Sequence, residues 1–253
     1  MQPLSAVIIT RNESRNIGRC LAALQGLCED LVVVDAQSTD DTCSIAERSG
    51  ARVIVRAWTD YSDQKNFANA QARHDHILSL DADEELSADL RASIEAIKQQ
   101  GFTGAYSMNR LTNYCGTWVR HGGWYPDTKV RIFDRRTTRW EGSHVHETLA
   151  LAPGTPVTLL KGDLLHYSYP SIADHLERIE RYSDLHARKL FGSGRKAGAV
   201  KRWLSPVAKF LSGYVLQGGF LDGRAGFDIA RLSARAVYLK YAKLNDLHRA
   251  QGA

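Results

Sequence analysis

Short apolar runs alternate with segments of helical periodicity over the first 86 residues. Runs rich in Val, Ile and Leu predict strands at residues 4–10, 31–35, 52–55 and 77–80. The intervening segments predict helices at residues 16–27, 39–46 and 64–72. Strands that alternate with helices favour a doubly wound α/β sheet, which binds ligands at the carboxyl ends of its strands.

After Ser87 this alternation stops. A helix is predicted at residues 87–99, and strands are predicted at 104–110, 129–134 and 157–160. Residues 114–126 are rich in aromatic side chains and glycine. Two interpretations remain open for this segment, a mobile loop that covers a site and an ordinary loop held by aromatic contacts.

The C-terminal part of the chain has a helical pattern. Ser171 and Asp174 have the spacing of a helix-capping pair, and the glycines at 192–194 indicate a hinge. Two amphipathic segments follow. The apolar side of the first holds Trp203, Val207, Phe210, Leu211, Tyr214 and Val215, and that of the second holds Ile229, Leu232, Val237, Tyr238, Tyr241 and Leu244.

Composition narrows the class of protein. Of 253 residues, 43% are hydrophobic and 24% charged, as in globular proteins, and no apolar stretch is long enough to cross a bilayer. We find no signal-peptide pattern and no zinc-like spacing of the four cysteines, so we expect a reducing cytoplasmic location. The net charge is +5, yet residues 195–253 hold 11 Lys or Arg against 3 Asp, which predicts an anionic surface or polyanion as partner.

The candidate chemistry lies where the predicted strands end. Asp81 and Asp83 follow the fourth strand, and paired carboxylates there suit a divalent cation that holds a diphosphate, although acidic pairs are also common on solvated turns. Asp35 closes the second strand, where it could accept the N3–H of uracil or only cap the turn. Residues 10–13 follow the first strand and could bind a ligand or simply open a helix. Glu84 and Glu85 are expected to open the next helix, where acids are favoured.

Taken together, these motifs resemble family 2 glycosyltransferases, which have the GT-A fold. The segments that carry the resemblance are 7–13, 33–40, 64–66, 80–84, 129–133, 140–147 and 165–169. Taken together, all seven segments are similar to the bacterial lipopolysaccharide inner-core beta-1,4-glucosyltransferase subfamily. One departure concerns residues 35–40, where Ala36 and Gln37 stand in place of the family's more usual Asp and Gly.

The resemblance implies a GT-A catalytic domain at 1–168, with a nucleotide-sugar half at 1–86 and an acceptor half at 87–168, followed by a helical extension at 169–253. Thr10 and Asp35 would contact the base and Lys65 the nucleotide or its phosphates. Asp83 would bind Mn²⁺ or Mg²⁺ directly, with Asp81 on the ribose or a metal-bound water and His166 completing the metal site. The full nucleotide-sugar set would be Thr10, Asn12, Glu13, Asp35, Lys65, Asp81, Ala82, Asp83, Arg120 and Arg131.

An inverting transfer also needs a carboxylate base for the acceptor hydroxyl. Glu147 resembles the family's base position, and Asp127 and Glu141 are alternatives. Arg120, Lys129 and Arg131 could bind phosphate, or they could lie on the solvated surface.

The expected activity is transfer of glucose from UDP-glucose to a heptose of the lipopolysaccharide core at the cytoplasmic face of the inner membrane. Another UDP-hexose, ADP-heptose, or another lipid-linked or cell-surface glycan acceptor remains an alternative, as does a non-catalytic binding protein. No nucleic-acid motif is present, so nucleic acid is not an expected partner. The basic C-terminal helices could lie on anionic lipid or pack as a helical subdomain.

Overall fold

The computed structural model describes residues 1–142 and 147–252. They form two compact units: Met1–Arg110 with Asp127–Tyr167, and Leu111–Pro126 with Ser168–Ala253. Residues 111–126, which the sequence analysis assigned to the catalytic domain, therefore group with the C-terminal helices.

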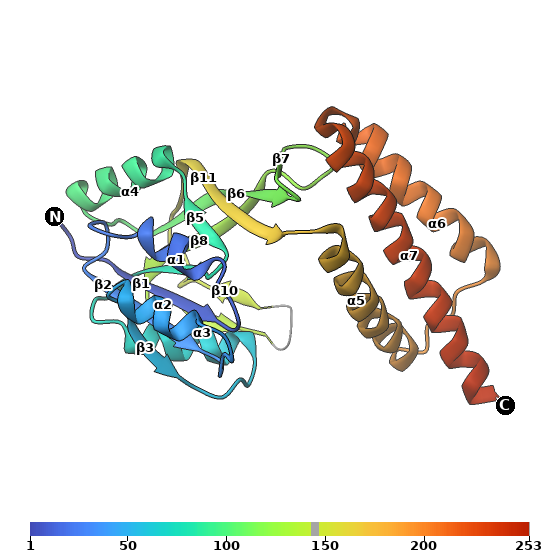
Figure 1. Cartoon of the computed structure of the whole chain (residues 1–253), viewed down its shortest axis with the longest axis horizontal. Helices are drawn as coiled ribbons and strands as arrows, with labels where there is room; N and C mark the ends of the chain where they lie inside the picture. The colour runs from blue at the N-terminus through green and yellow to red at the C-terminus, as the bar shows by residue number, and fades with distance from the viewer. Residues whose placement is uncertain (143–146, 253) are drawn as a thin grey trace. The chain divides into compact units, whose positions relative to one another are not determined.

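Four parallel strands form one half of the main sheet in the first unit (Figure 1). They are β1 (Ser5–Thr10), β2 (Asp30–Asp35), β3 (Arg52–Val55) and β4 (His76–Asp81). They lie in the order β3-β2-β1-β4. The chain therefore proceeds from β1 through β2 to β3 on one side of β1, and β4 then pairs with the other side of β1. All four strands were predicted from their apolar runs. Strands β1, β2 and β4 are almost entirely buried, as is usual for parallel strands covered on both faces, whereas the edge strand β3 is half-buried.

The sheet continues in the order β8-β6-β11-β5, where β8 runs antiparallel to β4 and to β6, and β11 runs antiparallel to β5. These strands are β5 (Glu84–Leu86), β6 (Ala105–Tyr114), β8 (Asp127–Asp134) and β11 (Val157–Tyr169), and β7 (Thr117–Val119) pairs with β6. Two short strands, β9 (Arg139–Glu141) and β10 (Thr148–Ala150), form a separate pair.

One sequence expectation fails in this half of the sheet. Glu84 and Glu85 do not open a helix, because they form β5 and pair with residues 164–166 of β11. The helix begins later, at Ala88, and Ser87 caps it by accepting a hydrogen bond from the backbone N–H of Leu90.

Four helices accompany the sheet: α1 (Ile17–Ala22), α2 (Thr42–Arg48), α3 (Tyr61–Gln71) and α4 (Ala88–Gln100). Helix α1 is shorter than its predicted range of 16–27. The residues after Ala22 continue as turns, and Gly26 adopts a positive φ of 71° that ends the helical path.

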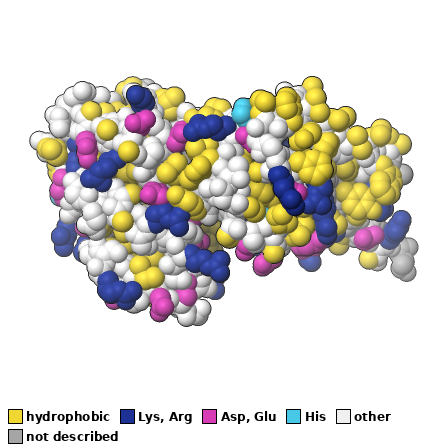
Figure 2. Space-filling model, turned by 45° about the horizontal axis from the view of Figure 1, so that its top comes forward, with side chains coloured by type: hydrophobic (Ala, Val, Ile, Leu, Met, Phe, Trp, Pro, Cys, Tyr) yellow, Lys and Arg dark blue, Asp and Glu magenta, His cyan; other side chains and the backbone are white. Residues whose placement is uncertain are grey.

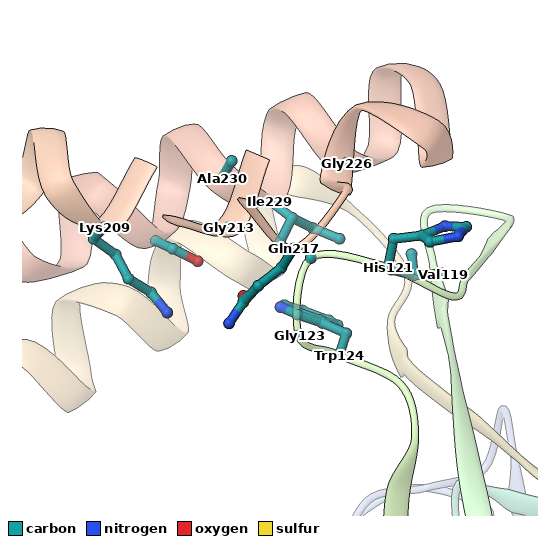
Figure 3. A pocket seen from close by; sticks show the side chains of 12 residues that line it. Val119, His121, Gly123, Trp124, Lys209, Gly213, Gln217, Gly226, Ile229 and Ala230 are labelled. Carbon is teal, nitrogen blue, oxygen red and sulfur yellow. The ribbon is translucent and has the colours of Figure 1, made fainter. Parts of the chain in front are cut away.

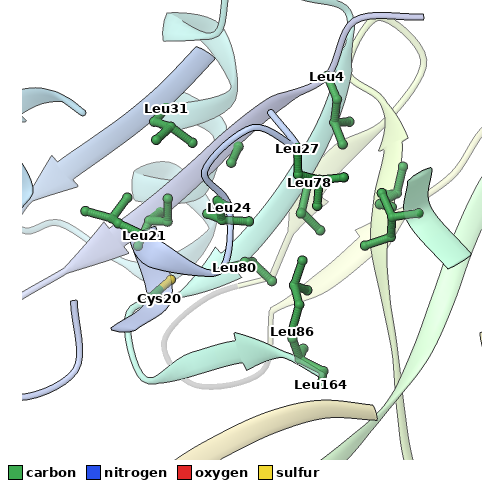
Figure 4. Packing of buried hydrophobic residues seen from close by; sticks show 14 of the residues in the cluster. Leu4, Cys20, Leu21, Leu24, Leu27, Leu31, Leu78, Leu80, Leu86 and Leu164 are labelled. Atoms are coloured by element: carbon green, nitrogen blue, oxygen red, sulfur yellow. The ribbon is translucent and has the colours of Figure 1, made fainter. Parts of the chain in front are cut away.

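The alternation of side chains along β1 divides the first unit into two cores. Leu4, Ala6 and Ile8 point to the face that packs against α1, α2 and α4 (Figure 4). Val7 and Ile9 point to the opposite face, where α3 and residues of β8 and β9 cover them. A sheet covered on both faces leaves its strand ends as the place for polar function.

The second unit consists of helices that follow β11. They are α5 (Ile172–Gly192), α6 (Ala199–Leu211), a π-helical turn η1 (Ser212–Leu216), a 3₁₀ turn η2 (Gly219–Asp222) and α7 (Gly223–Gly252). Ser171 caps α5 by accepting from the N–H of Asp174, which confirms the predicted capping pair. Helix α7 packs against both α5 and α6. No helix of the described residues is long and apolar enough to cross a membrane.

The loop at 114–126 is held by aromatic contacts within the second unit. Trp124 packs against Tyr114, Tyr169 and His175, with ring centroids between 5.3 and 6.3 Å apart. The hydroxyl of Tyr114 lies 2.9 Å from Nδ1 of His175. These contacts agree with the interpretation of an aromatic-held loop.

Candidate functional site

The register of the parallel strands brings the predicted donor-site residues to one edge of the sheet. Thr10, the last residue of β1, is paired with Asp35, the last residue of β2. On its other side β1 is paired with β4, where Ile9 lies opposite Asp81. Three strands therefore end side by side, each with a polar residue at its carboxyl end, as expected for a nucleotide-binding edge.

Thr10 and Asp35 differ in how their polar atoms are satisfied. Thr10 is buried, and its Oγ1 has no hydrogen-bond partner among the described residues. The carboxylate of Asp35 accepts from the N–H of Ser38 at 2.7 Å and from the hydroxyl of Ser38. Asp35 thus caps its turn, and its remaining lone pairs can still accept a bond from a ligand.

The loops after β1 and β2 are tied to each other through Asn12. Its backbone N–H donates to Ser38 Oγ at 2.7 Å, and its Oδ1 accepts from the N–H of Thr39 at 2.8 Å. Asn12 has a positive φ of 53°, which Asn tolerates better than most residues. The backbone N–H of Glu13 donates to Thr42 Oγ1 at 2.8 Å, and its carboxylate accepts from the side chain of Asn16 at 2.7 Å, a local contact at the start of α1.

Lys65 of α3 lies between two of the predicted carboxylates. Its Nζ is 3.4 Å from Asp81 Oδ1 and 3.4 Å from Glu147 Oε1, and it lies 4.5 Å from the centre of the Trp140 ring. The Lys65 side chain is only 4% exposed. Glu147 comes from a distant part of the chain, so the fold brings together residues that the sequence separates by 82 positions. Residues 143–146, which belong to the same motif as Glu147, lie outside the described residues.

Arg131 is buried beneath this cluster. Its guanidinium donates to Asp81 Oδ2 at 2.8 Å and to Glu84 Oε1 at 2.5 Å. Glu84 is fully buried, and its other oxygen accepts from the backbone N–H of Asp81 at 2.9 Å. Burial alone would raise the pKa of Asp81, but the positive charges of Lys65 and Arg131 hold that pKa well below its usual value. Asp81 is therefore a carboxylate with cations on both of its oxygens.

Asp83 has a different partner from Asp81. Its Oδ2 lies 3.3 Å from Nε2 of His166, and the two side chains are 17% and 13% exposed. His166 sits on β11 opposite Glu84 of β5, so the pairing of these strands sets its place beside the turn that holds Ala82 and Asp83. Among the described residues, no group of three or more His, Cys, Asp or Glu side chains could hold a metal ion. A cation here would need further oxygen ligands from a bound molecule or water.

The alternative base residues lie in other surroundings. Asp127 is held by Arg110 at 2.6 Å and by Lys129 at 2.8 Å. Burial tends to raise the pKa of Asp127, but the hydrogen bonds and charges of Lys129 and Arg110 lower it. Glu141 is exposed on β9. Lys129 is thus an ion-pair partner of Asp127.

Arg120 belongs to the second unit. Its backbone N–H donates to Asp222 Oδ1 at 3.2 Å, and its guanidinium lies 5.2 Å from the centre of the Tyr125 ring. The same unit holds a cavity of about 150 Å³ lined by parts of the 119–124 loop, α6, η1 and α7. The side chains of Trp124, Lys209 and Gln217 point toward this opening (Figure 3). None of the predicted donor-site residues lines it.

Three features of the site were not found from the sequence. The sequence predicts Glu84 at the start of a helix and gives no signal for Arg110 or for Arg19, which stacks at 3.7 Å over the ring of Tyr167. The hydroxyl of Tyr167 in turn donates to Glu85 at 2.9 Å. The places of Glu84 and Glu85 follow from the pairing of β5 with β11, which no local pattern signals.

The comparison with known families decides the class of protein. A model of the glycosyl transferase family 2 matches residues 5–161, which include the ends of β1, β2 and β4 together with Lys65 and Glu147, whereas His166 follows the matched segment. The chain belongs to glycosyl transferase family 2. Its mixed sheet with C-terminal helices is the GT-A fold, as the sequence motifs predicted.

Curated relatives of this family 2 chain extend over nearly its whole length. It is 33% identical to an uncharacterized glycosyltransferase, RP128, of Rickettsia prowazekii, over 98% of this chain and 88% of the relative. It is 28% identical to the lipopolysaccharide core biosynthesis glycosyltransferase LpsC of Rhizobium meliloti, over 97% and 93% of the two chains.

The fold of this family 2 chain is also similar to that of a solved structure. This structure is the mannosyltransferase PcManGT of Pyrobaculum calidifontis in complex with GDP-Man and Mn²⁺. It matches with a TM-score of 0.55 at 14% identity, over 97% of this chain and 88% of that one. At that identity the match supports the fold alone.

Proposed function

We propose that this chain is an inverting, metal-dependent hexosyltransferase that moves glucose from UDP-glucose to a heptose of the lipopolysaccharide inner core. The observation that carries the proposal is the convergence of Lys65, Asp81 and Glu147 beside the ends of β1 and β2. Family membership supports the reaction class, and the similarity to LpsC supports the acceptor class.

The donor half of the proposal uses the ends of β1 and β2. The buried Thr10 Oγ1 lacks a partner among the described residues, and such an atom costs free energy unless a ligand or water satisfies it. A uracil ring beside Asp35 would supply an N–H to that carboxylate and a carbonyl to the threonine hydroxyl. Adenine also offers an N–H to a carboxylate, so ADP-heptose stays the alternative donor. Lys65 would meet the diphosphate, with Asn12 and the backbone of Ala82 nearby.

The residues present fit a divalent cation. Asp83 and His166 are oxygen and nitrogen donors 3.3 Å apart, and the diphosphate and water would complete the set. Bound there, Mn²⁺ or Mg²⁺ would stabilise the negative charge of the departing diphosphate. Asp81, which already has cations on both oxygens, suits the ribose or a metal-bound water better than the metal itself.

Glu147 is the proposed base. In a single displacement the acceptor hydroxyl attacks the anomeric carbon and passes its proton to the Glu147 carboxylate. The bond from that carbon to the diphosphate oxygen breaks, and UDP leaves with the bonding electrons. One such displacement inverts the anomeric configuration.

The test is a transfer assay with the purified chain, Mn²⁺, UDP-glucose and a heptose-terminated core acceptor. We expect glucose transfer with a β linkage by NMR, and UDP to bind more tightly than ADP in calorimetry. Glu147→Gln should lower kcat by about 10²–10⁴-fold with little change in the Kd of UDP, because a general base contributes on that scale.

The control is Glu95→Gln, an exposed glutamate on α4 that should keep full turnover. Full activity of Glu147→Gln together with loss of activity in Glu141→Gln or Asp127→Asn would move the base role to that residue. Tighter binding of ADP would overturn the UDP assignment. Nucleotide binding without turnover on any donor would favour a non-catalytic binding protein.

A further inference from the structure

Helix α6 exposes one of its sides although that side is apolar. Five side chains recur along it at intervals of one, three and four residues, so they share a stripe. Their exposed fractions are 71% for Val200, 60% for Trp203, 62% for Leu204, 55% for Val207 and 49% for Leu211. Scattered exposed leucines are normal in proteins, but a continuous apolar stripe of this length is not.

The apolar surface continues beyond the end of α6. Val215 and Leu216 of η1 are 51% and 83% exposed, and Phe220 and Leu221 of η2 are 52% and 62% exposed. Aromatic contacts join these turns to α7, since Tyr214 packs against both Phe220 and Phe227. We call the exposed residues Val200, Trp203, Leu204, Val207, Leu211, Val215, Leu216, Phe220, Leu221 and Phe227 the apolar face.

The second amphipathic segment does not belong to this face. Ile229, Leu232 and Leu244 of α7 are between 1% and 3% exposed, because α7 packs against α5 and α6. The two alternatives left open for the C-terminal helices therefore apply to different segments: the segment on α7 packs within the helical subdomain, and the segment on α6 and η1 carries the exposed face. Hydrophobic side chains gather over the C-terminal helices in the space-filling view (Figure 2).

The exposed charges of the same segment are mostly of one sign. Between residues 198 and 231 the basic residues are Lys201, Arg202, Lys209, Arg224 and Arg231, and the acids are Asp222 and Asp228. The side chains of Asp222 and Asp228 are only 6% and 10% exposed, and they pair with His121 and with Arg224 and Arg231. The charge that this segment presents to its surroundings is therefore positive.

We propose that the apolar face docks on an anionic lipid bilayer, with the side of α6 and the η1–η2 turns inserted among the lipid chains near the headgroups. The inference rests on the proposed function only in that a lipid-anchored acceptor gives the docking a use. A segment with an exposed apolar stripe and surrounding basic side chains is attracted to anionic lipid by the burial of its apolar surface and by electrostatic attraction to the headgroups. A second copy of this chain is a poorer occupant, since a twofold contact would bring the same positive charges together.

The test is flotation of the full-length chain with vesicles of neutral lipid containing phosphatidylglycerol. We expect binding that increases with the anionic fraction and weakens in high salt. Leu204→Gln with Leu216→Gln should weaken vesicle binding by at least about tenfold, because each leucine loses its transfer into the apolar layer. The matched control is Leu185→Gln, a leucine on α5 that is 50% exposed and lies off the apolar face, and it should bind as the parent chain does.

Equal loss of vesicle binding in the control, or no binding by the parent chain, would overturn the proposal. Concentration-dependent dimerisation without lipid that the double substitution abolishes would assign the face to a second copy instead. Transfer to a detergent-dispersed acceptor reports separately on the proposed function. Full transfer without vesicle binding would refute only the docking, and vesicle binding without transfer would refute only the enzyme assignment.

Discussion

At the scale of single residues, the site depends on how Asp81 is held. A carboxylate at a strand end is ordinarily free to rotate toward solvent. Here Arg131 and Lys65 take one oxygen each, and the backbone N–H of Asp81 donates to Glu84. The carboxylate is thereby fixed before any ligand arrives, which lowers the cost of ordering it on binding.

The buried ion pairs of Arg131 lead to a prediction about stability. Arg131→Met leaves Glu84 without its closest cation in a fully buried place, so we expect the free energy of unfolding to fall by about 3–5 kcal/mol. Arg136→Met is the matched control, because the side chain of Arg136 is 62% exposed in its pairs with Asp134 and Asp75. Exposed pairs contribute about 0–1 kcal/mol. Urea denaturation measures both, and equal losses would show that Arg131 is not the cation on which this buried charge depends.

Sequence reasoning located the residues at the strand ends but not all of their contacts. Thr10, Asp35 and Asp81 were found because apolar runs mark where buried strands stop. Arg131 was read as a phosphate-binding or surface residue, and it is instead a buried partner of two carboxylates. Its burial follows from the antiparallel pairing of β8 with β4, a long-range contact that leaves no periodic trace near Arg131 itself.

At the scale of elements, local signals predicted the parallel strands and the N-terminal cap of α5. Apolar runs and capping residues are properties of a few neighbouring residues, so a single segment is enough to read them. Strand β5 was missed because its two glutamates satisfy the pattern of a helix start, and only β11, about 80 residues away, makes them a strand. Strand β11 was predicted as 157–160 but extends to Tyr169, since polar residues interrupt its apolar run.

The aromatic contact between β6, β11 and α5 makes the stability of the second unit depend on pH. Burial, and then the charge of Arg178, lower the pKa of His175 to about 4. In the unfolded chain a histidine titrates near pH 6.5, so between about pH 6.5 and 4 the unfolded chain holds a proton that the folded chain lacks. The contribution of His175 to the free energy of unfolding is therefore fully present above pH 6.5 and is lost as the pH falls toward 4.

We expect His175→Gln to reduce the loss of unfolding free energy between pH 7 and pH 5 by about 2 kcal/mol relative to the parent chain. The control is His186→Gln, an exposed histidine of the same helix, which should keep the dependence of the parent chain. Denaturant unfolding at the two pH values, followed by tryptophan fluorescence, gives the comparison. If the unfolding free energy of His175→Gln falls as much between pH 7 and pH 5 as that of the parent chain, the acid sensitivity belongs to other groups.

At the scale of the whole molecule, the proposed donor site at the strand ends and the apolar face belong to different units. The strand ends with Thr10, Asp35, Asp81 and Lys65 lie in the first unit, and the apolar face lies in the second. Each unit has hydrophobic clusters of its own. Arg120, which is also a predicted donor contact, is a residue of the second unit. Nucleotide binding can therefore be used to test which of the two units it stabilises.

Hydrogen exchange with UDP and Mn²⁺ should answer that question. Saturating nucleotide stabilises the unit that binds it, by about 2.7 kcal/mol at a concentration one hundred times Kd, so amides that exchange by opening of that unit should slow by up to about 100-fold. We expect slowing at the ends of β1, β2 and β4 and in α3, and no change along α6 and α7. Asp83→Asn should reduce the slowing, because the proposed cation would lose a ligand. Slowing at residues 117–122 would support Arg120 as a donor contact, whereas unchanged exchange there, with an unaltered UDP affinity in Arg120→Gln, would remove Arg120 from the donor site and leave nucleotide binding to the first unit.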